Sequence, residues 1–328
     1  MFRINFPESK NPHVPALNLL RGIAALLVAI YHIIPNGKAI EGYPVIKKIL
    51  LQGHLGLDMF FIISGFVIPY SMFQNKYSLS KFHIYLLKRI TRIEPPYIIS
   101  FLCIILLYNI NCWMNGWEYT MNWPQFFSHF GYLNSYLGYE SYNSVYWTLA
   151  IEFQFYILIG LFFPLIMHQK KLFGIIIFLF FGTLSFWLNL KYNLFIFQYG
   201  FHFMAGVILF LFMVKKIKWP TFILFTIFCA LIAGRQYFEV GITVIVTVLA
   251  ILFVRKTWII TDFFGKISYS FYLTHHELFG WTMLFIGVTS INEFILKILI
   301  FTGAIAFATI FYFAFERPAL ILSKRIKY

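Results

Sequence analysis

The stretch Leu20-Arg21-Gly22-Ile23-Ala24-Ala25-Leu26-Leu27-Val28-Ala29-Ile30-Tyr31-His32 decides the fold class, because it is apolar between Arg21 and the closing Tyr31-His32 pair. With its neighbours it forms an apolar run over residues 16–34. An α-helix of that length crosses a hydrocarbon core of about 30 Å. We therefore expect a membrane-spanning helix that carries both an arginine and a histidine.

The composition of the whole chain agrees with a membrane protein. Of the 328 residues, 60% are hydrophobic and only 12% are charged, whereas soluble domains carry about 25% charged residues. The net charge of +14 also suits a nucleic-acid-binding protein. The basic residues gather in short loops between apolar runs, however, which is how charge orients a membrane protein. We expect one membrane domain over residues 1–328 and no nucleic-acid partner.

Apolar runs of spanning length recur along the chain. They predict an all-α membrane protein, a polytopic bundle of about ten transmembrane helices. The division into two runs around Gly234 is the least certain, because only a short turn separates them. The runs cover residues 16–34, 54–73, 95–112, 145–167, 172–190, 195–214, 219–234, 237–254, 265–288 and 295–315.

The distribution of lysine and arginine tests this topology. With ten spans, 19 of the 26 basic residues fall on the side of the N-terminus and 6 on the opposite side, while Arg21 lies within the first span. Cytoplasmic loops carry the excess of basic residues in membrane proteins. The sequence therefore predicts that both termini are cytoplasmic.

Arg21 and His32 are expected on one face of the first span. They are eleven residues apart, which is three helical turns plus about 20° and a rise of about 16 Å. Ionisable side chains inside a span face the protein interior and indicate function. Taken singly, Arg21 can be an end residue that reaches toward the interface, and His32 can be a packing histidine.

Asp58 and Glu152 are expected at the level of His32. Asp58 enters the second span from outside, and Glu152 lies about two turns into the fourth span. A carboxylate that orients a histidine is a common arrangement for a general base. The alternatives for Asp58 are a helix cap or an ion pair with a lysine of a loop.

The segment Ser80–Arg92 is short, basic and partly apolar, and it predicts an amphipathic helix on the cytoplasmic surface. Arg89 and Arg92 are three residues apart and lie on one helical face. Two guanidinium groups in this arrangement can bind phosphates through forked hydrogen bonds. The alternative is that they anchor the helix to anionic lipid headgroups.

Two further segments are less specific. The outer loop over residues 113–144 is rich in Trp, Tyr, Asn and Ser, which suits either stacking on sugars or a position at the headgroup interface; we expect it to select the acceptor. His275 and His276 are adjacent, so on a helix they point in different directions. No spacing of His, Asp and Glu requires a metal, and none is predicted.

Six short motifs occur in order along nearly the whole chain, and together they resemble the acyltransferase 3 family of bacterial integral-membrane acyltransferases. Each motif alone is weak, but six in register are specific. They are Arg21 with His32 eleven residues later, Gly56–Phe66, Arg89-x-x-Arg92 followed by Pro95, Trp147–Tyr156, Ile267–His275, and Glu316-Arg317-Pro318.

The resemblance implies transfer of an acyl group, usually acetyl, from cytoplasmic acetyl-CoA to a carbohydrate acceptor outside a bacterial inner membrane. Such acceptors include the O-antigen of lipopolysaccharide, other surface polysaccharides and lipid-linked sugars. The implied roles are general base for His32 with Asp58 and Glu152 in support, donor binding for Arg21, Arg89 and Arg92, and acceptor contact for Trp147, Tyr272 and His275.

Two departures from the family pattern stand out. An aromatic residue and a proline usually follow the late histidine, whereas this chain has His276 and Glu277. Many relatives also carry an extracytoplasmic hydrolase-like domain, and a stand-alone form without it is expected here. Two other functions remain open: a transporter or flippase, which also places charged residues inside a bundle, and an enzyme that acylates a non-sugar acceptor.

Overall fold

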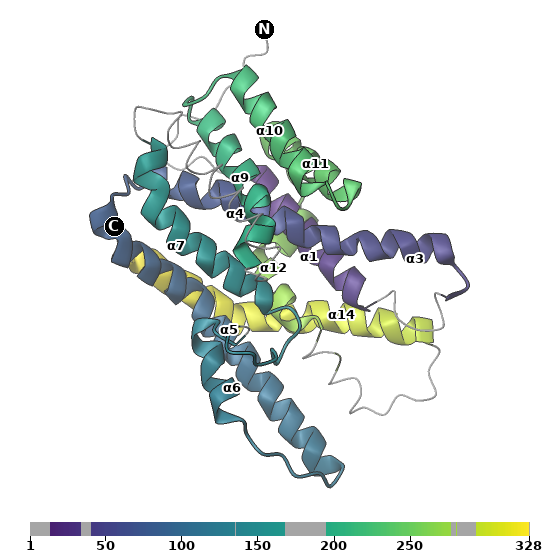
Figure 1. Ribbon diagram of the computed structural model, residues 1–328. Coiled ribbons are helices and arrows are strands. Elements are labelled where there is room, and N and C mark those ends of the chain that lie inside the picture. The colour runs from purple at the N-terminus through teal and green to yellow at the C-terminus, as the bar shows by residue number, and fades with distance from the viewer. Residues whose placement is uncertain are drawn as a thin grey trace.

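The computed structural model describes residues 14–33, 41–134, 136–167, 195–276, 280 and 293–327. This described part is helical and contains no strand, as predicted (Figure 1). Five of its helical stretches are long and apolar enough to cross a membrane, and shorter apolar helices accompany them over 198–213, 219–233 and 238–253. The protein is thus a polytopic helical membrane protein. The predicted run 172–190 lies outside the described residues.

Most helices follow the predicted apolar runs, including the pair divided at Gly234. The run 265–288 does not, because its helix ends at Thr274, and residues 277–279 and 281–288 lie outside the described part. A side chain on Gly241 would come within 2.7 Å of the carbonyl oxygen of Ala230, so the two helices of this hairpin touch where the turn brings them together. The helices are α1 (Pro15–Ile33), α3 (Pro44–Leu51), α4 (Leu55–Gln74), α5 (Phe82–Met114), α6 (Trp123–Ser128), α7 (Trp147–Met167), α9 (Phe195–Met213), α10 (Trp219–Ala233), α11 (Phe238–Phe253), α12 (Ile259–Thr274), α14 (Glu293–Phe311) and α15 (Arg317–Arg325).

The predicted surface helix at Ser80–Arg92 is wrong as a separate element. Its residues from Phe82 onward form the first part of α5, a single helix of 33 residues that runs through Pro95 and Pro96. Prolines are tolerated inside membrane helices because neighbouring groups satisfy the carbonyls that they leave without a donor. At about 1.5 Å per residue, α5 is about 50 Å long and extends beyond a bilayer core of about 30 Å.

Glycines allow the central helices to approach closely. A side chain on Gly65 of α4 would collide with the backbone of Phe203 in α9, and one on Gly206 would collide with Ile62 in return. Gly265 of α12 meets the backbone of Asn18 in α1 in the same way. Apolar burial gives no driving force between helices in lipid, so close van der Waals packing through small residues stabilises the bundle. Helices α1, α4, α9 and α12 therefore form its centre.

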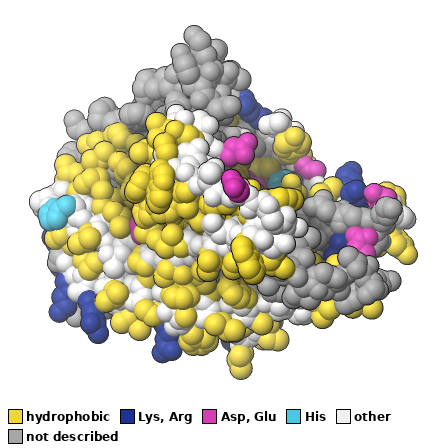
Figure 2. All heavy atoms as spheres, turned by 90° about the horizontal axis from the view of Figure 1, so that it is seen from below, with side chains coloured by type: hydrophobic (Ala, Val, Ile, Leu, Met, Phe, Trp, Pro, Cys, Tyr) yellow, Lys and Arg dark blue, Asp and Glu magenta, His cyan; other side chains and the backbone are white. Residues whose placement is uncertain are grey.

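The two ends of the described chain meet on one side of the bundle. Helix α15 packs against α5, and Lys88 near the start of α5 donates a hydrogen bond of 3.3 Å to the carbonyl of Ile326. Asn18 near the start of α1 and Lys324 of α15 line the same cavity. This agrees with the prediction that both termini are cytoplasmic. Figure 2 shows one face on which hydrophobic side chains predominate, with Lys and Arg at several places around its edge.

Candidate functional site

Two cavities open within the bundle and share a wall. The outer cavity, of about 420 Å³, lies at the end of α1 that carries His32. The inner cavity, of about 380 Å³, lies toward the N-terminal ends of α1 and α5. Leu57 and Tyr272 line both. The Tyr272 hydroxyl lies 2.7 Å from Thr148 Oγ1 and donates to the carbonyl of Val145 at 3.1 Å, so hydrogen bonds hold this shared wall in place.

The inner cavity brings together the three arginines that the sequence singled out. Arg21, Arg89 and Arg92 all line it, with Lys266 and Lys324 beside them. Arg21 interacts electrostatically with both other arginines. Like charges this close repel one another. The cavity is therefore strongly basic and is suited to a polyanionic ligand.

Arg89 is the most deeply placed of the three. Its side chain is buried, so it does not lie on a lipid-facing surface as the alternative required. Its guanidinium carbon lies 5.6 Å from the ring centre of Tyr85 and 5.8 Å from that of Tyr156, within the range of cation–π attraction. The Nε atom has no hydrogen-bond partner among the described residues. A buried donor without a partner is costly, and an anion in the cavity would satisfy it.

Glu152 lies in the inner cavity and not beside His32. It accepts hydrogen bonds from Ser64 Oγ at 2.9 Å and from the Tyr156 hydroxyl at 2.6 Å. It also interacts electrostatically with Arg21. The predicted position of Glu152 at the level of His32 is therefore wrong, because its partner Ser64 lies six residues further along α4 than Asp58, about 9 Å deeper in the bundle.

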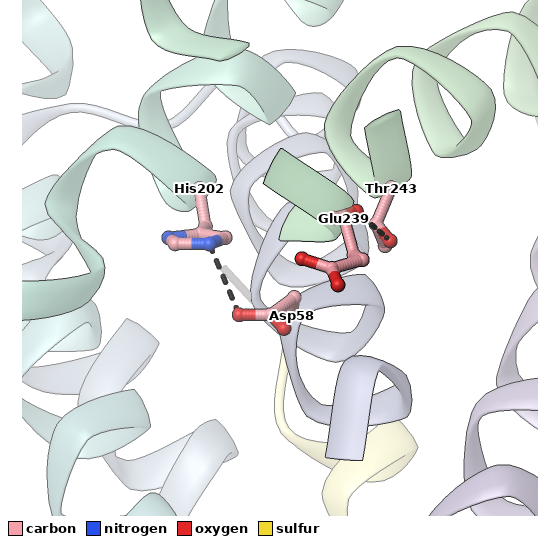
Figure 3. A network of polar contacts seen from close by, with 4 residues as sticks. All are labelled: Asp58, His202, Glu239 and Thr243. Atoms are coloured by element: carbon pink, nitrogen blue, oxygen red, sulfur yellow. Dashed lines mark hydrogen bonds and ion pairs between the residues drawn. The ribbon is translucent and has the colours of Figure 1, made fainter. Parts of the chain in front are cut away.

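Asp58 does line the outer cavity with His32, but its partner is another histidine. Its Oδ1 lies 3.0 Å from Nε2 of His202, and both side chains are buried (Figure 3). The sequence reasoning missed His202. The available signal was a histidine within the apolar run 195–214, since ionisable residues in spans usually indicate function.

The ring of His32 packs against two other histidines. Its centre lies 5.3 Å from that of His275 and 4.7 Å from that of His276. The expectation that these neighbours cannot both face one site assumed a continuous helix. Helix α12 ends at Thr274, and both histidines lie in the turn that follows, so the helical spacing of side chains no longer applies.

His275 lines neither of these cavities, although its ring packs on that of His32, and its predicted contact with the acceptor stays a prediction. Its Nδ1 lies 3.0 Å from the carbonyl of Phe271 and 2.9 Å from that of Tyr272. A carbonyl can only accept, so Nδ1 carries the proton and Nε2 is an acceptor. That Nε2 is buried without a partner among the described residues. Glu277 lies outside the described residues.

The outer loop contributes little to the outer cavity. Among the described residues of the expected acceptor loop, only its last one, Ser144, lines the cavity. Trp147 and Tyr272, both predicted to contact the acceptor, line it from α7 and α12. The loop tryptophans Trp117 and Trp123 are exposed instead, which suits a position at the headgroup interface.

His129 holds this loop against α5. Its ring stacks on Phe101 with centres 5.2 Å apart and planes 3° from parallel. Nδ1 donates to the carbonyl of Gln125 at 2.9 Å, and Nε2 accepts the backbone N–H of Tyr142 at 3.2 Å. This arrangement requires a neutral imidazole. Burial lowers the pKa of His129 below its usual value of 6.5.

Acidification should therefore loosen the loop. Since the folded pKa lies below the unfolded one, the stabilisation is complete above about pH 6.5 and is lost as the pH falls toward the lowered value. Hydrogen exchange at the Tyr142 amide should accelerate, beyond its intrinsic pH dependence, as the pH falls below about 6.5. His129→Phe keeps the stacking and removes the titration, so the same excess acceleration in that variant would contradict this role.

Among the described residues, no three His, Cys, Asp or Glu side chains gather closely enough to hold a metal ion. That no metal takes part stays a prediction from the sequence.

Comparison with known proteins identifies the family. The sequence matches the family described as "Acyltransferase domain" over residues 14–317. The chain belongs to this acyltransferase family. The match covers α1 to the start of α15, which includes the whole lining of the outer cavity and that of the inner cavity except Leu320 and Lys324.

The curated relatives of this acyltransferase are O-acetyltransferases. It is 26% identical over 172 residues to the O-acetyltransferase OatA of Staphylococcus aureus strain NCTC 8325, a match covering 48% of this chain and 26% of the relative. It is 29% identical over 177 residues to a putative O-acetyltransferase of Staphylococcus aureus strain COL, covering 48% and 25%. The match thus spans about a quarter of each relative's length. No solved structure matches the chain.

Proposed function

We propose that this acyltransferase moves an acetyl group from cytoplasmic acetyl-CoA to a hydroxyl of a carbohydrate acceptor at the outer face of a bacterial inner membrane. The observation that carries the proposal is the pair of cavities that meet at Leu57 and Tyr272. One is basic and lies toward the cytoplasm, and the other holds histidines and aromatic rings. O-antigen, another surface polysaccharide or a lipid-linked sugar would each fit as acceptor.

The inner cavity has the chemistry needed to hold the donor. Coenzyme A carries phosphates, and arginine binds phosphate through forked, charge-assisted hydrogen bonds. Arg89 and Arg92 are assigned to these phosphates, and the Nε of Arg89 is already without a partner among the described residues. Arg21 lies on α1, the helix that carries His32 at its other end, and is assigned to the arm of the donor that leads to the thioester.

His32 is assigned the role of general base in a direct transfer. It removes the proton from an acceptor hydroxyl, whose oxygen attacks the thioester carbonyl. The carbon–sulfur bond then breaks and coenzyme A leaves as a thiolate. This thiolate takes up the proton that His32 removed from the hydroxyl. Asp58 pairs with His202, and Glu152 accepts hydrogen bonds from Ser64 and Tyr156. We therefore assign the orientation of the His32 ring to His275. Its Nε2 is an acceptor without a hydrogen-bond partner among the described residues and lies in the ring that packs on His32.

The remaining members of the predicted site keep supporting roles. Glu152 lies among the arginines of the inner cavity, where its charge partly offsets theirs. Trp147 lines the outer cavity and offers an aromatic face to a sugar ring.

Mass spectrometry of surface glycans tests the proposal. Cells that contain the protein should carry O-acetyl groups that are missing from cells without it, and complementation should restore them. In membrane vesicles, added acceptor should release free coenzyme A from acetyl-CoA in step with acetylation. Unchanged glycans together with movement of a glycan in the absence of coenzyme A release would favour a transporter and overturn the proposal.

A further inference from the structure

The outer cavity has a second wall that the reaction described above does not use. It is built from α9 and from the turn between α10 and α11. Gln198 and His202 project from α9, and Arg235, Gln236 and Tyr237 come from the turn. This wall is rich in groups that donate and accept hydrogen bonds, although the helices that carry it are apolar.

His202 is the unusual member of this wall. Only 4% of its surface is exposed, yet neither ring nitrogen makes an aligned hydrogen bond to a described residue. The 3.0 Å contact with Asp58 is short enough for an ion pair but is not directed along a ring N–H. A buried polar atom without a hydrogen bond costs free energy unless a ligand or water satisfies it. Figure 3 shows the imidazole and the Asp58 carboxylate converging from α9 and α4.

Aromatic rings lie next to this pair. The centre of the Trp147 ring is 5.7 Å from that of Tyr199, and the Tyr199 ring is 5.5 Å from that of His202. Aromatic faces accept the C–H face of a sugar ring, while carboxylate, imidazole and amide groups bind its hydroxyls. A mostly apolar cavity with a few converging polar groups is the usual form of a small-molecule site.

We propose that Asp58, His202, Gln198 and Gln236, together with the rings of Trp147 and Tyr199, form a recognition subsite for one pyranose ring of the acceptor. This rests on the proposed function and extends it. The subsite binds hydroxyls that are not acetylated and so decides which hydroxyl reaches His32 on the opposite side of the same cavity. Acceptor selectivity then belongs to α9 and the α10–α11 turn, and not to the outer loop over residues 113–144.

The test uses the full chain in lipid nanodiscs with acetyl-CoA and a panel of methyl glycosides of hexoses, 6-deoxyhexoses and N-acetylhexosamines. Release of free thiol reports turnover. His202→Ala and Gln236→Ala should raise the KM for the preferred glycoside about 10- to 100-fold and leave the KM for acetyl-CoA unchanged. His202→Asn, which keeps a polar group near the position of Nδ1, should recover part of the loss. Trp123→Ala in the exposed loop is the control.

The outcomes separate this subsite from the proposed function. If loop variants change the order of preferred glycosides while the His202 variants do not, the subsite is wrong. If the wild type releases no thiol with any glycoside, the proposed reaction fails on this panel, and binding of the same glycosides is followed by tryptophan fluorescence. Binding that is lost in His202→Ala then supports the subsite, and absence of glycoside binding to the wild type overturns it.

Discussion

Replacing His32 by alanine should abolish acetyl transfer while the protein still inserts and folds. His32 lies at the outer end of α1, lines the outer cavity and packs on His275 and His276. Loss of a general base lowers rates by roughly 10²- to 10⁴-fold. Acceptor-dependent release of coenzyme A measures the loss. Binding of acetyl-CoA should change little, since the basic groups lie in the other cavity.

The control for this prediction is His83→Ala, because His83 is exposed on α5 and lines neither cavity. Its activity should equal that of the wild type. If His275 orients His32, the activity of a His275→Ala variant should lie between that of His32→Ala and that of His83→Ala. Its loss should appear in kcat more than in the KM for the acceptor. Wild-type activity in His32→Ala would remove the general base from the mechanism.

The double variant Arg89→Ala, Arg92→Ala should lose binding of acetyl-CoA. Both side chains line the inner cavity, and each is assigned to phosphate. A hydrogen bond to a charged group contributes about 1.5–3 kcal/mol. Two such losses weaken binding by at least about a hundredfold. Acetyl-CoA should therefore raise the melting temperature of the wild type and leave that of the variant unchanged.

Because Arg89 is buried, the alanine variant also loses packing against Tyr85 and Tyr156. Arg89→Lys with Arg92→Lys keeps the charge but removes the forked geometry, and it should bind acetyl-CoA with intermediate affinity. Arg255→Ala, which removes an exposed basic residue outside the inner cavity, should behave as the wild type. Equal stabilisation of all four proteins by acetyl-CoA would contradict the assignment of the donor to this cavity.

The sequence alone determined the class of fold, and it predicts on which side of the membrane the two ends lie. Apolar length predicts spanning helices because a bilayer imposes one distance on all of them. The uneven distribution of lysine and arginine predicts the orientation of the helices, because cytoplasmic loops of membrane proteins carry an excess of these residues. The turn at Gly234 followed from the same rules, and so did the position of Arg21, Arg89 and Arg92 on one side of the bundle.

Only the tertiary structure decided which charged groups pair. Depth along a helix follows from the rise per residue, which placed Asp58 at the outer cavity but put Glu152 too close to the outer face. The direction in which each faces depends on how the helices rotate against one another, and glycines such as Gly65 and Gly206 set that packing. In the structure, Asp58 pairs with His202, and Glu152 lies among the arginines of the inner cavity. It also brings His275 and His276 to His32, because α12 ends one residue before them.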